Sequence, residues 1–478
     1  MKKKTIIFAG ILLATSLSAC SAPEVNISDK QNSATESIST EDSISTEDSI
    51  SAEESLNTEE KSSTEENIGT EENNEEIADS NENSTEDTDE ISAEEKVTYD
   101  NSAEYNAYVL SDKDALVGGT YTATGKDESA IEASGNVTAT VTGTLINKAS
   151  GDASSADDSS FKGVNSAVRV YGNAEVTLKD CTVLADADNA TGVFAYDGGI
   201  INISDSTINV TGGGAGGVQV AGGGTLYGYN LTVTSASKAA IRSDRGGGIM
   251  VIDGGSYTST GKNGCPAIYS TADITVKNAE CISTNSRAVI IEGKNSVTLE
   301  NCVLSGNDQS TKSGSVKANV LLYQSASGDA KEGTSIFDMT GGSITSESGA
   351  MFYCTNTASV INLKEAALNL SDDGTLLIVS EGRWGKEGKN GGKCTFNATS
   401  QILEGDIIVD SISSLEFNLS ENSVYTGAIS SEGSVTVNLE SGSTWVLTGD
   451  SYISEFNGDI EDVQINGYTL YVNGKAFN

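Results

Sequence analysis

The stretch SAVRVYGNAEVTLKDCTVLADADNATGVFAYDGGIINIS (residues 166–204) carries one pattern twice, and the pattern continues to residue 304. Each unit has a run of alternating apolar residues, a Gly-rich turn, a second alternating run and another turn, and it returns about every 21 to 27 residues. The first runs, placed in register, begin at Val168, Val193, Val218, Ile241, Ile268 and Val289, and the second runs begin at Val176, Ile201, Ile274 and Val297.

Short strands with a period of two that recur at a near-fixed spacing are typical of a parallel β-helix, in which each unit is one coil stacked on the last. The composition agrees, with 6% aromatic residues, 51 Gly and only 2 Pro. No convincing helical run follows the first twenty residues, so we expect an all-β fold. A solenoid grows by adding coils, and 478 residues need no division into globular domains.

Residues 1–19 are typical of an export signal, with three lysines, a short apolar run and the small-residue sequence LSA before Cys20. This ending resembles a bacterial lipobox, which implies cleavage before Cys20, acylation of that residue, and a membrane contact through the lipid alone. A plain transmembrane anchor is the alternative, although the apolar run is short for one. The expected location is the outer face of the cell membrane.

Residues 20–97 form a separate region that is rich in Ser, Thr and Glu. Residues 21–96 hold 25 acidic residues against 3 Lys and almost no aromatic ones. Such a chain cannot bury enough apolar surface to offset its conformational entropy, so we expect a disordered linker. A stalk through the cell wall and an acidic segment that binds cations or a partner are its two interpretations. The rest of the chain is also acidic, and the net charge of the whole chain is -41. An acidic surface repels the phosphates of nucleic acid, so we expect no nucleic-acid partner.

Residues 98–478 are expected to form the β-helix domain. In them, residues 98–165 are interpreted as an irregular cap with the first coils, and residues 305–319 as a polar insertion. Six cysteines lie in this region, and Cys281 and Cys302 should be close neighbours on adjacent coils. In-line stacking of buried thiols and a disulfide are both compatible with that spacing. No cysteine pair has metal-ligand spacing and the chain has no His, so we predict no metal site of that kind.

Side chains alternate across a strand, so the residues that follow the inward Val and Ile positions should face outward. Aromatic rings, guanidinium groups and carboxylates that repeat along a flat face suit an extended polymer, whereas a solvated face with ordinary cross-strand ladders is the alternative. Trp384 lies on a Gly-rich loop and is a stacking candidate if it is exposed; Trp445 is expected in the core. The ligand-binding candidates are Arg169, Tyr171, Tyr196, Arg242, Asp244, Arg245, Tyr269, Glu292 and Trp384.

Catalysis has weaker support in the sequence. Arg242 as a base beside carboxylate-held calcium would suit polysaccharide β-elimination, but a self-satisfied Arg/Asp ladder is the competing interpretation. Asp244 and Glu292 fit a hydrolytic carboxylate pair only loosely. We therefore predict no catalytic residues and no required cofactor, with calcium left open.

Several segments resemble the right-handed parallel β-helix proteins of the pectate-lyase-like superfamily, and in particular clostridial-type exported lipoproteins and adhesin-like surface proteins. They are AAIRSDRGGG (239–248), PAIYSTADITV (266–276), VIIEGKNSVTL (289–299), YQSASGDA (323–330), RWGKEGKNGG (383–392) and GSTWVLTGDSYI (442–453). The resemblance implies a right-handed coil and a polysaccharide ligand. The chain lacks the His of the hydrolases in that superfamily and an evident calcium-binding Asp cluster. A non-catalytic binder or adhesin is the expected function, with a calcium-dependent pectate-type lyase and a ligand-free spacer as alternatives.

Overall fold

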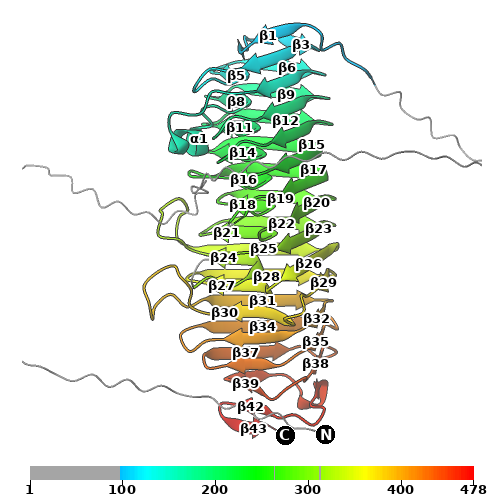
Figure 1. Ribbon diagram of the computed structural model, residues 1–478. Coiled ribbons are helices and arrows are strands. Elements are labelled where there is room, and N and C mark those ends of the chain that lie inside the picture. Colours follow the sequence, from blue (N-terminus) through cyan, green and yellow to red (C-terminus); the bar gives the residue numbers. More distant parts are fainter. Residues whose placement is uncertain (1–96, 263, 312–313, 478) are drawn as a thin grey trace, which may run out of the picture. The chain divides into compact units, whose positions relative to one another are not determined.

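The computed structural model describes residues 97–262, 264–311 and 314–477. The predicted signal peptide, Cys20 and the acidic linker up to residue 96 lie outside the described residues. In the described part, the chain winds through stacked coils, and neighbouring coils pair through parallel strands (Figure 1). The predicted all-β parallel β-helix is confirmed, and its coils continue beyond the insertion to the parallel strand at Leu470–Val472.

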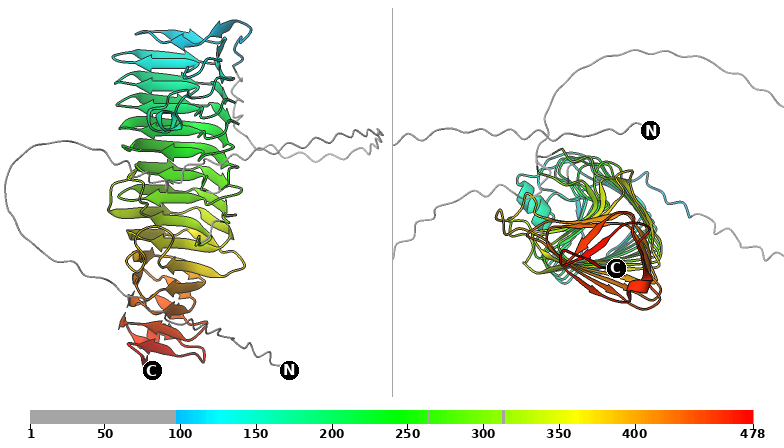
Figure 2. Two further views of the ribbon diagram at one scale, coloured as in Figure 1. Left: turned by 60° about the vertical axis from the view of Figure 1, so that its left-hand side comes forward. Right: turned by 90° about the horizontal axis from the view of Figure 1, so that it is seen from below.

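Each coil has three faces, which surround one apolar core (Figure 2). Face 1 is a 13-stranded sheet of β2 (Tyr108–Val109), β5 (Ile131–Ser134), β8 (Val168–Tyr171), β11 (Val193–Tyr196), β14 (Val218–Ala221), β16 (Ile241–Ser243), β18 (Ile268–Ser270), β21 (Val289–Glu292), β24 (Ala318–Tyr323), β27 (Ala350–Thr355), β30 (Thr375–Val379), β33 (Asp406–Val409) and β36 (Ile429–Ser431). Face 2 follows it in each coil and contains β3 (Ala115–Val117), β6 (Thr138–Thr142), β9 (Glu175–Lys179), β12 (Ile200–Ser204), the first halves of β15 (Gly224–Ser235) and β17 (Gly248–Ser259), β19 (Asp273–Lys277), β22 (Ser296–Glu300), β25 (Thr334–Thr340), β28 (Ala358–Lys364), β31 (Lys393–Thr399), β34 (Ser414–Ser420), β37 (Ser434–Leu439) and β40 (Glu455–Asn457).

Face 3 completes the coil with β1 (Glu104–Asn106), β4 (Thr120–Ala123), β7 (Leu145–Lys148), β10 (Thr182–Ala185), β13 (Thr207–Val210), the second halves of β15 and β17, β20 (Glu280–Ser283), β23 (Val303–Asn307), β26 (Ser343–Ser348), β29 (Ala367–Asn369), β32 (Ile402–Glu404), β35 (Val424–Thr426), β38 (Thr444–Val446) and β41 (Val463–Gln464). The long strands β15 and β17 run through both faces, so face 2 and the face 3 strands up to β29 join into one 23-stranded sheet, while β32, β35, β38 and β41 form a separate four-stranded sheet. The C-terminal end carries β39 (Ser451–Ile453), β42 (Leu470–Val472) and β43 (Lys475–Phe477), and β42 and β43 pair antiparallel.

The predicted register of face 1 is confirmed strand by strand. Val168 pairs with Val193, and the same column continues through Val218, Ile241 and Ile268 to Val289. On face 2 the column from Val176 to Ile201 and the pair of Ile274 with Val297 are also in the expected register. Inward Val and Ile side chains therefore stack on one another, which fixes the register because a slip of one residue would turn them to solvent.

One predicted detail of the coil is wrong. Each coil has a third strand, which the two-strand interpretation of the repeat omitted; β10, for example, directly follows Cys181. Residues 98–165, predicted as an irregular cap with the first coils, contain strands β1 to β7, of which β4 and β7 pair in register, and then a loop with the helix at 156–162. Face 3 strands are short and follow the face 2 strands almost without a break. The sequence periodicity therefore does not distinguish a face 3 strand from the turn that follows face 2.

The corner between faces 2 and 3 explains part of the sequence pattern. In ten successive coils one residue at this corner has a positive φ, and most of these residues are Asn, Asp or Gly, the types that tolerate the left-handed conformation best. The corner residues are Asp180, Asp205, Asn230, Gly254, Asn278, Asn301, Gly341, Glu365, Ser400 and Glu421. A sharp bend at a constant position in each coil keeps the two sheets aligned.

The core becomes aromatic toward the C-terminal coils. Phe337, Phe352, Phe396 and Phe417 stack edge-to-face with ring centroids 5.5 to 5.7 Å apart. Trp445 is fully buried, as predicted, and donates a hydrogen bond from Nε1 to the carbonyl of Gly427.

One α-helix interrupts the β structure of the described residues, besides a single 3-10 turn, η1 (Ile460–Asp462), contrary to the prediction that no helical run would follow the first twenty residues. Helix α1 (Ala156–Lys162) begins after Ser155, whose side chain accepts a hydrogen bond from the backbone N–H of Asp158, and ends at Gly163 with a φ of 68°. Seven residues are too few to show a helical period in the sequence. No helix in the described residues is long and apolar enough to cross a membrane.

Candidate functional site

The outward side of face 1, where the sequence placed the ligand-binding platform, is covered by other parts of the chain. A second apolar cluster, separate from the main core, forms on this side, and its members include Ile290, Leu321, Tyr323, Tyr353 and Trp384. All five are at most 5% exposed. The side chains do point outward from the sheet as predicted, but the expectation that they meet solvent is wrong for most of the predicted platform.

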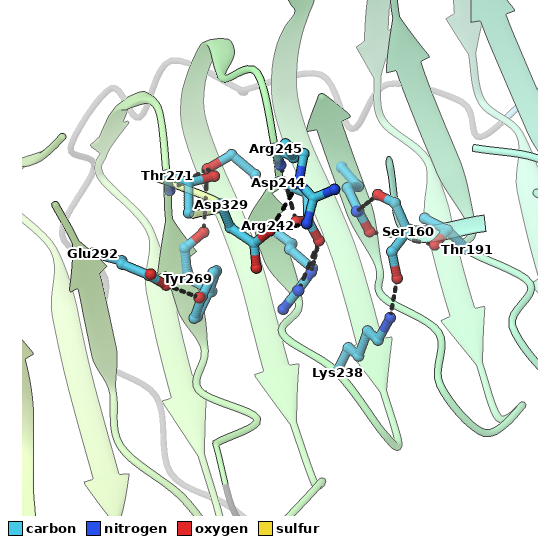
Figure 3. A network of polar contacts seen from close by, with 12 residues as sticks. Ser160, Thr191, Lys238, Arg242, Asp244, Arg245, Tyr269, Thr271, Glu292 and Asp329 are labelled. Carbon is cyan, nitrogen blue, oxygen red and sulfur yellow. Dashed lines mark hydrogen bonds and ion pairs between the residues drawn. The ribbon is translucent and has the colours of Figure 1, made fainter. Parts of the chain in front are cut away.

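Helix α1 covers the N-terminal part of this side. Gln219 on β14 donates a hydrogen bond from Nε2 to the carbonyl of Ser160 at 2.8 Å, and Lys238 donates from Nζ to the hydroxyl of Ser160 at 2.5 Å (Figure 3). Phe194 on β11 is fully buried, and a side chain at Gly163 would collide with its ring. The helix is thus bound to the sheet by polar and apolar contacts together.

Arg242 and Asp244 form a buried ion pair on β16 and just after it. Nε and Nη2 of Arg242 donate to Oδ2 of Asp244 at 3.1 and 2.7 Å, and the guanidinium lies 4.6 Å from the ring centre of Tyr269. Burial lowers the pKa of Arg242, but the charge and hydrogen bonds of Asp244, together with Tyr269 and Cys265, outweigh burial and the net shift is upward. The self-satisfied Arg/Asp pair that the sequence allowed is the arrangement observed, and neither group is free for a ligand.

Arg245 connects two segments that are far apart in sequence. Its Nε donates to Oδ1 of Asp329 at 2.9 Å, its guanidinium lies 4.0 Å from the ring centre of Phe161 on α1, and its backbone N–H donates to Asp244. Its side chain remains 52% exposed, whereas that of Asp329 is 10% exposed. Arg245 therefore joins α1 to the loop after β24 at the edge of the covered surface.

Glu292 is buried at the end of β21 and accepts three hydrogen bonds. Tyr269 and Tyr323 donate to Oε2 at 2.6 and 2.8 Å, and the hydroxyl of Ser325 donates to Oε1 (Figure 3 shows the contact with Tyr269). Burial, and then the neighbouring carboxylate, raise the pKa of Tyr269 well above its ordinary value. This carboxylate is held by three hydroxyl donors, and that of Asp244 by Arg242 and a backbone N–H, so both members of the loosely predicted hydrolytic pair are engaged within the protein.

A second buried ion pair attaches the insertion at residues 305–319 to face 1. Arg287 donates from Nη2 to Oδ2 of Asp308 at 2.9 Å and to the carbonyl of Val316 at 2.7 Å. Asp308 also accepts hydrogen bonds from the backbone N–H groups of Ser310 and Ala318. The polar residues of the insertion thus serve to close it over face 1.

The remaining predicted residues are partly or wholly engaged. Arg169 and Tyr171 both contact Glu132, at 3.5 and 3.1 Å, and the Arg169 guanidinium lies 4.1 Å from the Tyr171 ring centre. Tyr196 is half-buried, with its ring over a glycine of the next turn. Trp384 is 5% exposed and packs on Tyr323 with ring centroids 4.5 Å apart, so it is not an exposed stacking platform.

Within residues 97–262, 264–311 and 314–477 there is no group of three or more Cys, Asp or Glu side chains placed to hold a metal ion. The covered side of face 1 therefore offers a closed network of ion pairs and hydrogen bonds. Its geometry stabilises the packing of α1 and the loops on the sheet.

Face 2 provides the open surface that face 1 lacks. A groove of about 550 Å³ crosses six successive strands from β25 to β40 and is open to solvent. At about 4.8 Å per strand, it extends over roughly 24 Å along the stack. The residues that line it are mostly polar, with one Lys and one Glu among them: Thr334, Ala358, Ser359, Val360, Lys393, Cys394, Thr395, Ser414, Leu415, Glu416, Ser434, Thr436, Asn438 and Asn457.

An outward asparagine ladder runs through the same strands, and its last two members line the groove. Asn362, Asn397, Asn418, Asn438 and Asn457 pair in register on successive coils. Each amide donates from Nδ2 to Oδ1 of the preceding Asn at 2.6 to 2.9 Å, and Asn362 donates to Asp338. This repeated use of one donor and one acceptor holds every ladder amide in a fixed orientation along the face.

Two exposed aromatic residues on the N-terminal part of face 2 were also absent from the predicted site. Tyr227 and Tyr229 on β15 are 46% and 57% exposed, and Ile249 on β17 is 49% exposed beside them. The signal was present in the alternation of LYGYNL at residues 226–231, where Leu and Gly face inward and both Tyr outward. Tyr227 and Tyr229 were not predicted because no register was assigned to the second run of this unit.

Comparison with protein-family models, curated proteins and solved structures gave no match. The class of this protein is accordingly the one defined by its coils, a parallel β-helix, with a covered polar network on face 1 and an open polar groove on face 2.

Proposed function

We propose that this chain is a lipid-anchored protein of the outer cell surface, and that its β-helix holds an extended, uncharged polysaccharide along face 2 without cleaving it. The observation that supports this most is the open groove with its ordered asparagine ladder. The location rests on the sequence of residues 1–20, and the ligand class on the chemistry of the groove.

The form of the groove favours a polymer. Small-molecule sites are enclosed and mostly apolar, with few polar groups. This surface is open, elongated and polar over six strands, and its amides and hydroxyls recur at the spacing of the coils. Amide and hydroxyl side chains both donate and accept hydrogen bonds, which suits the hydroxyl groups of a sugar chain.

The charge of the groove favours a neutral ligand. Lys393 and Glu416 are the two charged side chains that line it, and their charges cancel. An acidic polymer such as a pectate would require an excess of Arg and Lys or bound cations. The calcium-dependent lyase therefore has less support than the non-catalytic binder, because Arg242, its candidate base, is buried in an ion pair.

The groove is tested by placing a long charged side chain in it. Thr395→Arg and Thr436→Arg each fill the groove at a partly buried, outward position. We expect each to reduce retention on neutral insoluble polysaccharides by at least tenfold. Thr298→Arg is the matched control, since Thr298 faces outward on the same face, three coils away from Thr395, and does not line the groove. Retention is measured by affinity electrophoresis and pulldown, with and without a chelator.

Equal retention of all three variants would show that the polymer binds elsewhere. Absence of retention of the unmodified chain on every polymer would favour the ligand-free spacer. Release of unsaturated uronides from pectins would establish the lyase.

The anchor is tested at Cys20. Replacing its thiol by a hydroxyl in Cys20→Ser removes the acyl acceptor, so we expect loss of metabolic palmitate label and release of the protein from the membrane fraction into the medium. Cys302→Ser, at a buried core thiol, is the control that should keep both label and location. A Cys20→Ser variant that stayed in the membrane fraction would refute the lipid anchor.

A further inference from the structure

Two cysteine side chains meet inside the β-helix, at the corner between face 1 and face 2. Cys354 lies on β27 and Cys394 on β31, in the next coil, and both point into the core. Their Sγ atoms are 3.7 Å apart, and the residues are 0% and 3% exposed. Two thiols are therefore in direct contact, although 40 residues separate them in the sequence.

Other thiols in the described part of the chain are directed elsewhere. Cys181 donates from Sγ to the carbonyls of Val141 and Lys179 at 3.4 and 3.3 Å, and Cys302 makes the equivalent contacts, with Val276 at 3.3 Å and Glu300 at 3.5 Å. Cys302, which was predicted to lie close to Cys281, therefore directs its thiol to the backbone. Cys265 likewise donates to a backbone carbonyl. The pair at Cys354 and Cys394 differs from these because each sulfur faces another sulfur.

We propose that Cys354 and Cys394 form a disulfide when the chain folds in an oxidising environment. An oxidant is available to the chain outside the cell, so this proposal rests on the proposed location. It does not depend on the proposed polysaccharide binding. A disulfide has its sulfur atoms about 2.05 Å apart, so formation of the bond brings the two atoms closer by a further ~1.6 Å. The bond would tie β27 to β31 beneath the groove, since Lys393 and Thr395, on either side of Cys394, face the groove.

The oxidation is an exchange with an exported or low-molecular-weight disulfide. The thiolate of one cysteine attacks the oxidant and releases one of its thiols. The second thiolate then attacks the mixed disulfide and releases the other, so that two cysteine thiols lose two protons and two electrons and the oxidant gains them. In the folded chain, its hydrogen bond with Cys354 and burial both raise the pKa of Cys394 well above its ordinary value. Because both side chains are also shielded from solvent, we expect the exchange to precede the stacking of β31 on β28, and the finished bond to be protected from reductants.

The experiment refolds the full chain with oxidised and reduced glutathione, quenches with acid, alkylates free thiols with N-ethylmaleimide and maps the tryptic peptides. Lysines at 364 and 393 place Cys354 and Cys394 in different peptides. We expect one cross-linked peptide pair containing these two residues, with Cys181, Cys265, Cys281 and Cys302 alkylated. The same pair is expected in protein recovered from the surface of a Gram-positive expression host.

Thermal unfolding provides the second measurement. A cross-link that closes a loop of about 40 residues reduces the entropy of the unfolded chain, so a reductant that acts on the unfolding protein should lower the midpoint of the unmodified chain by roughly 4 °C. Cys354→Ser and Cys394→Ser should lose this response, and Cys281→Ser should retain it. Alkylation of both residues after refolding, cross-links to other cysteines, or an identical reductant response in Cys354→Ser would each overturn the proposal.

Discussion

The outward sides of face 1 and face 2 belong to the same coils, but the first is covered by other segments of the chain and the second is open to solvent. On face 1, α1 and three loops cover the sheet, and acidic and basic groups are buried in pairs such as Arg242 with Asp244. On face 2, the corresponding side remains open, and its groove is lined mostly by neutral amides and hydroxyls beside an asparagine ladder. Charged residues in a β-helix are thus not by themselves evidence of a binding surface, because here they hold the covering segments in place.

The difference is encoded in the strands. Strand β24 reads Ala-Asn-Val-Leu-Leu-Tyr and β27 reads Ala-Met-Phe-Tyr-Cys-Thr, and every residue in both is buried. Strand β37 reads Ser-Val-Thr-Val-Asn-Leu and alternates between buried and accessible positions. Continuous apolar runs are typical of strands that are buried on both faces, and alternation is typical of strands with one wet face.

We expect the largest loss of stability from a substitution at Asp244, in the covered network of face 1. Removal of its carboxylate in Asp244→Ala leaves the guanidinium of Arg242 buried without its partner, which should reduce the free energy of unfolding by about 3–5 kcal/mol. Urea denaturation followed by circular dichroism measures the change. Asp253→Ala on face 2 is the control, since Asp253 accepts a hydrogen bond from Asn278 at the surface, and it should cost no more than about 1 kcal/mol.

Comparable losses in the two variants would contradict the comparison, because they would mean that the covered pair of face 1 is solvated like the surface of face 2. The double variant Arg242→Met with Asp244→Leu sharpens the test. It removes both charges together, so it should recover much of the stability lost in Asp244→Ala.

Much of the fold could be predicted from residues 166–304, because the inward column from Val168 to Val289 has one register that keeps every apolar side chain inside. The covering of face 1 could not be predicted in the same way. It depends on contacts such as that of Arg245 with Asp329, which are 84 residues apart in loops without a period. The candidate residues were correctly placed on the outward side, but whether that side is wet is decided by those loops. The groove could not be predicted, because outward Asn and Thr carry no charge and occur equally on an ordinary solvated sheet face.

The smallest expected effect concerns the ladder itself, at Asn418. Its amide donates to Asn397 at 2.7 Å and its oxygen accepts from Asn438 at 2.6 Å. In Asn418→Ala both neighbours turn to water on an open face, so we expect a loss of about 1 kcal/mol that does not change with pH. In Asn418→Asp the introduced carboxylate still accepts from Asn438 but faces the oxygen of Asn397, where a donor is needed.

Ionisation of that introduced carboxyl is disfavoured in the folded state, so its folded pKa lies above its unfolded value of about 3.9. The loss of stability relative to the unmodified chain is therefore full near pH 7, and it shrinks as the pH falls through the raised folded pKa, because protonation restores the donor. Urea denaturation of the three proteins between about pH 7 and pH 4 measures the difference at each pH. A pH-independent difference for Asn418→Asp would mean that the amides of the open face are not held in the donor-to-acceptor order described, and the ladder would then be no more ordered than any solvated sheet surface.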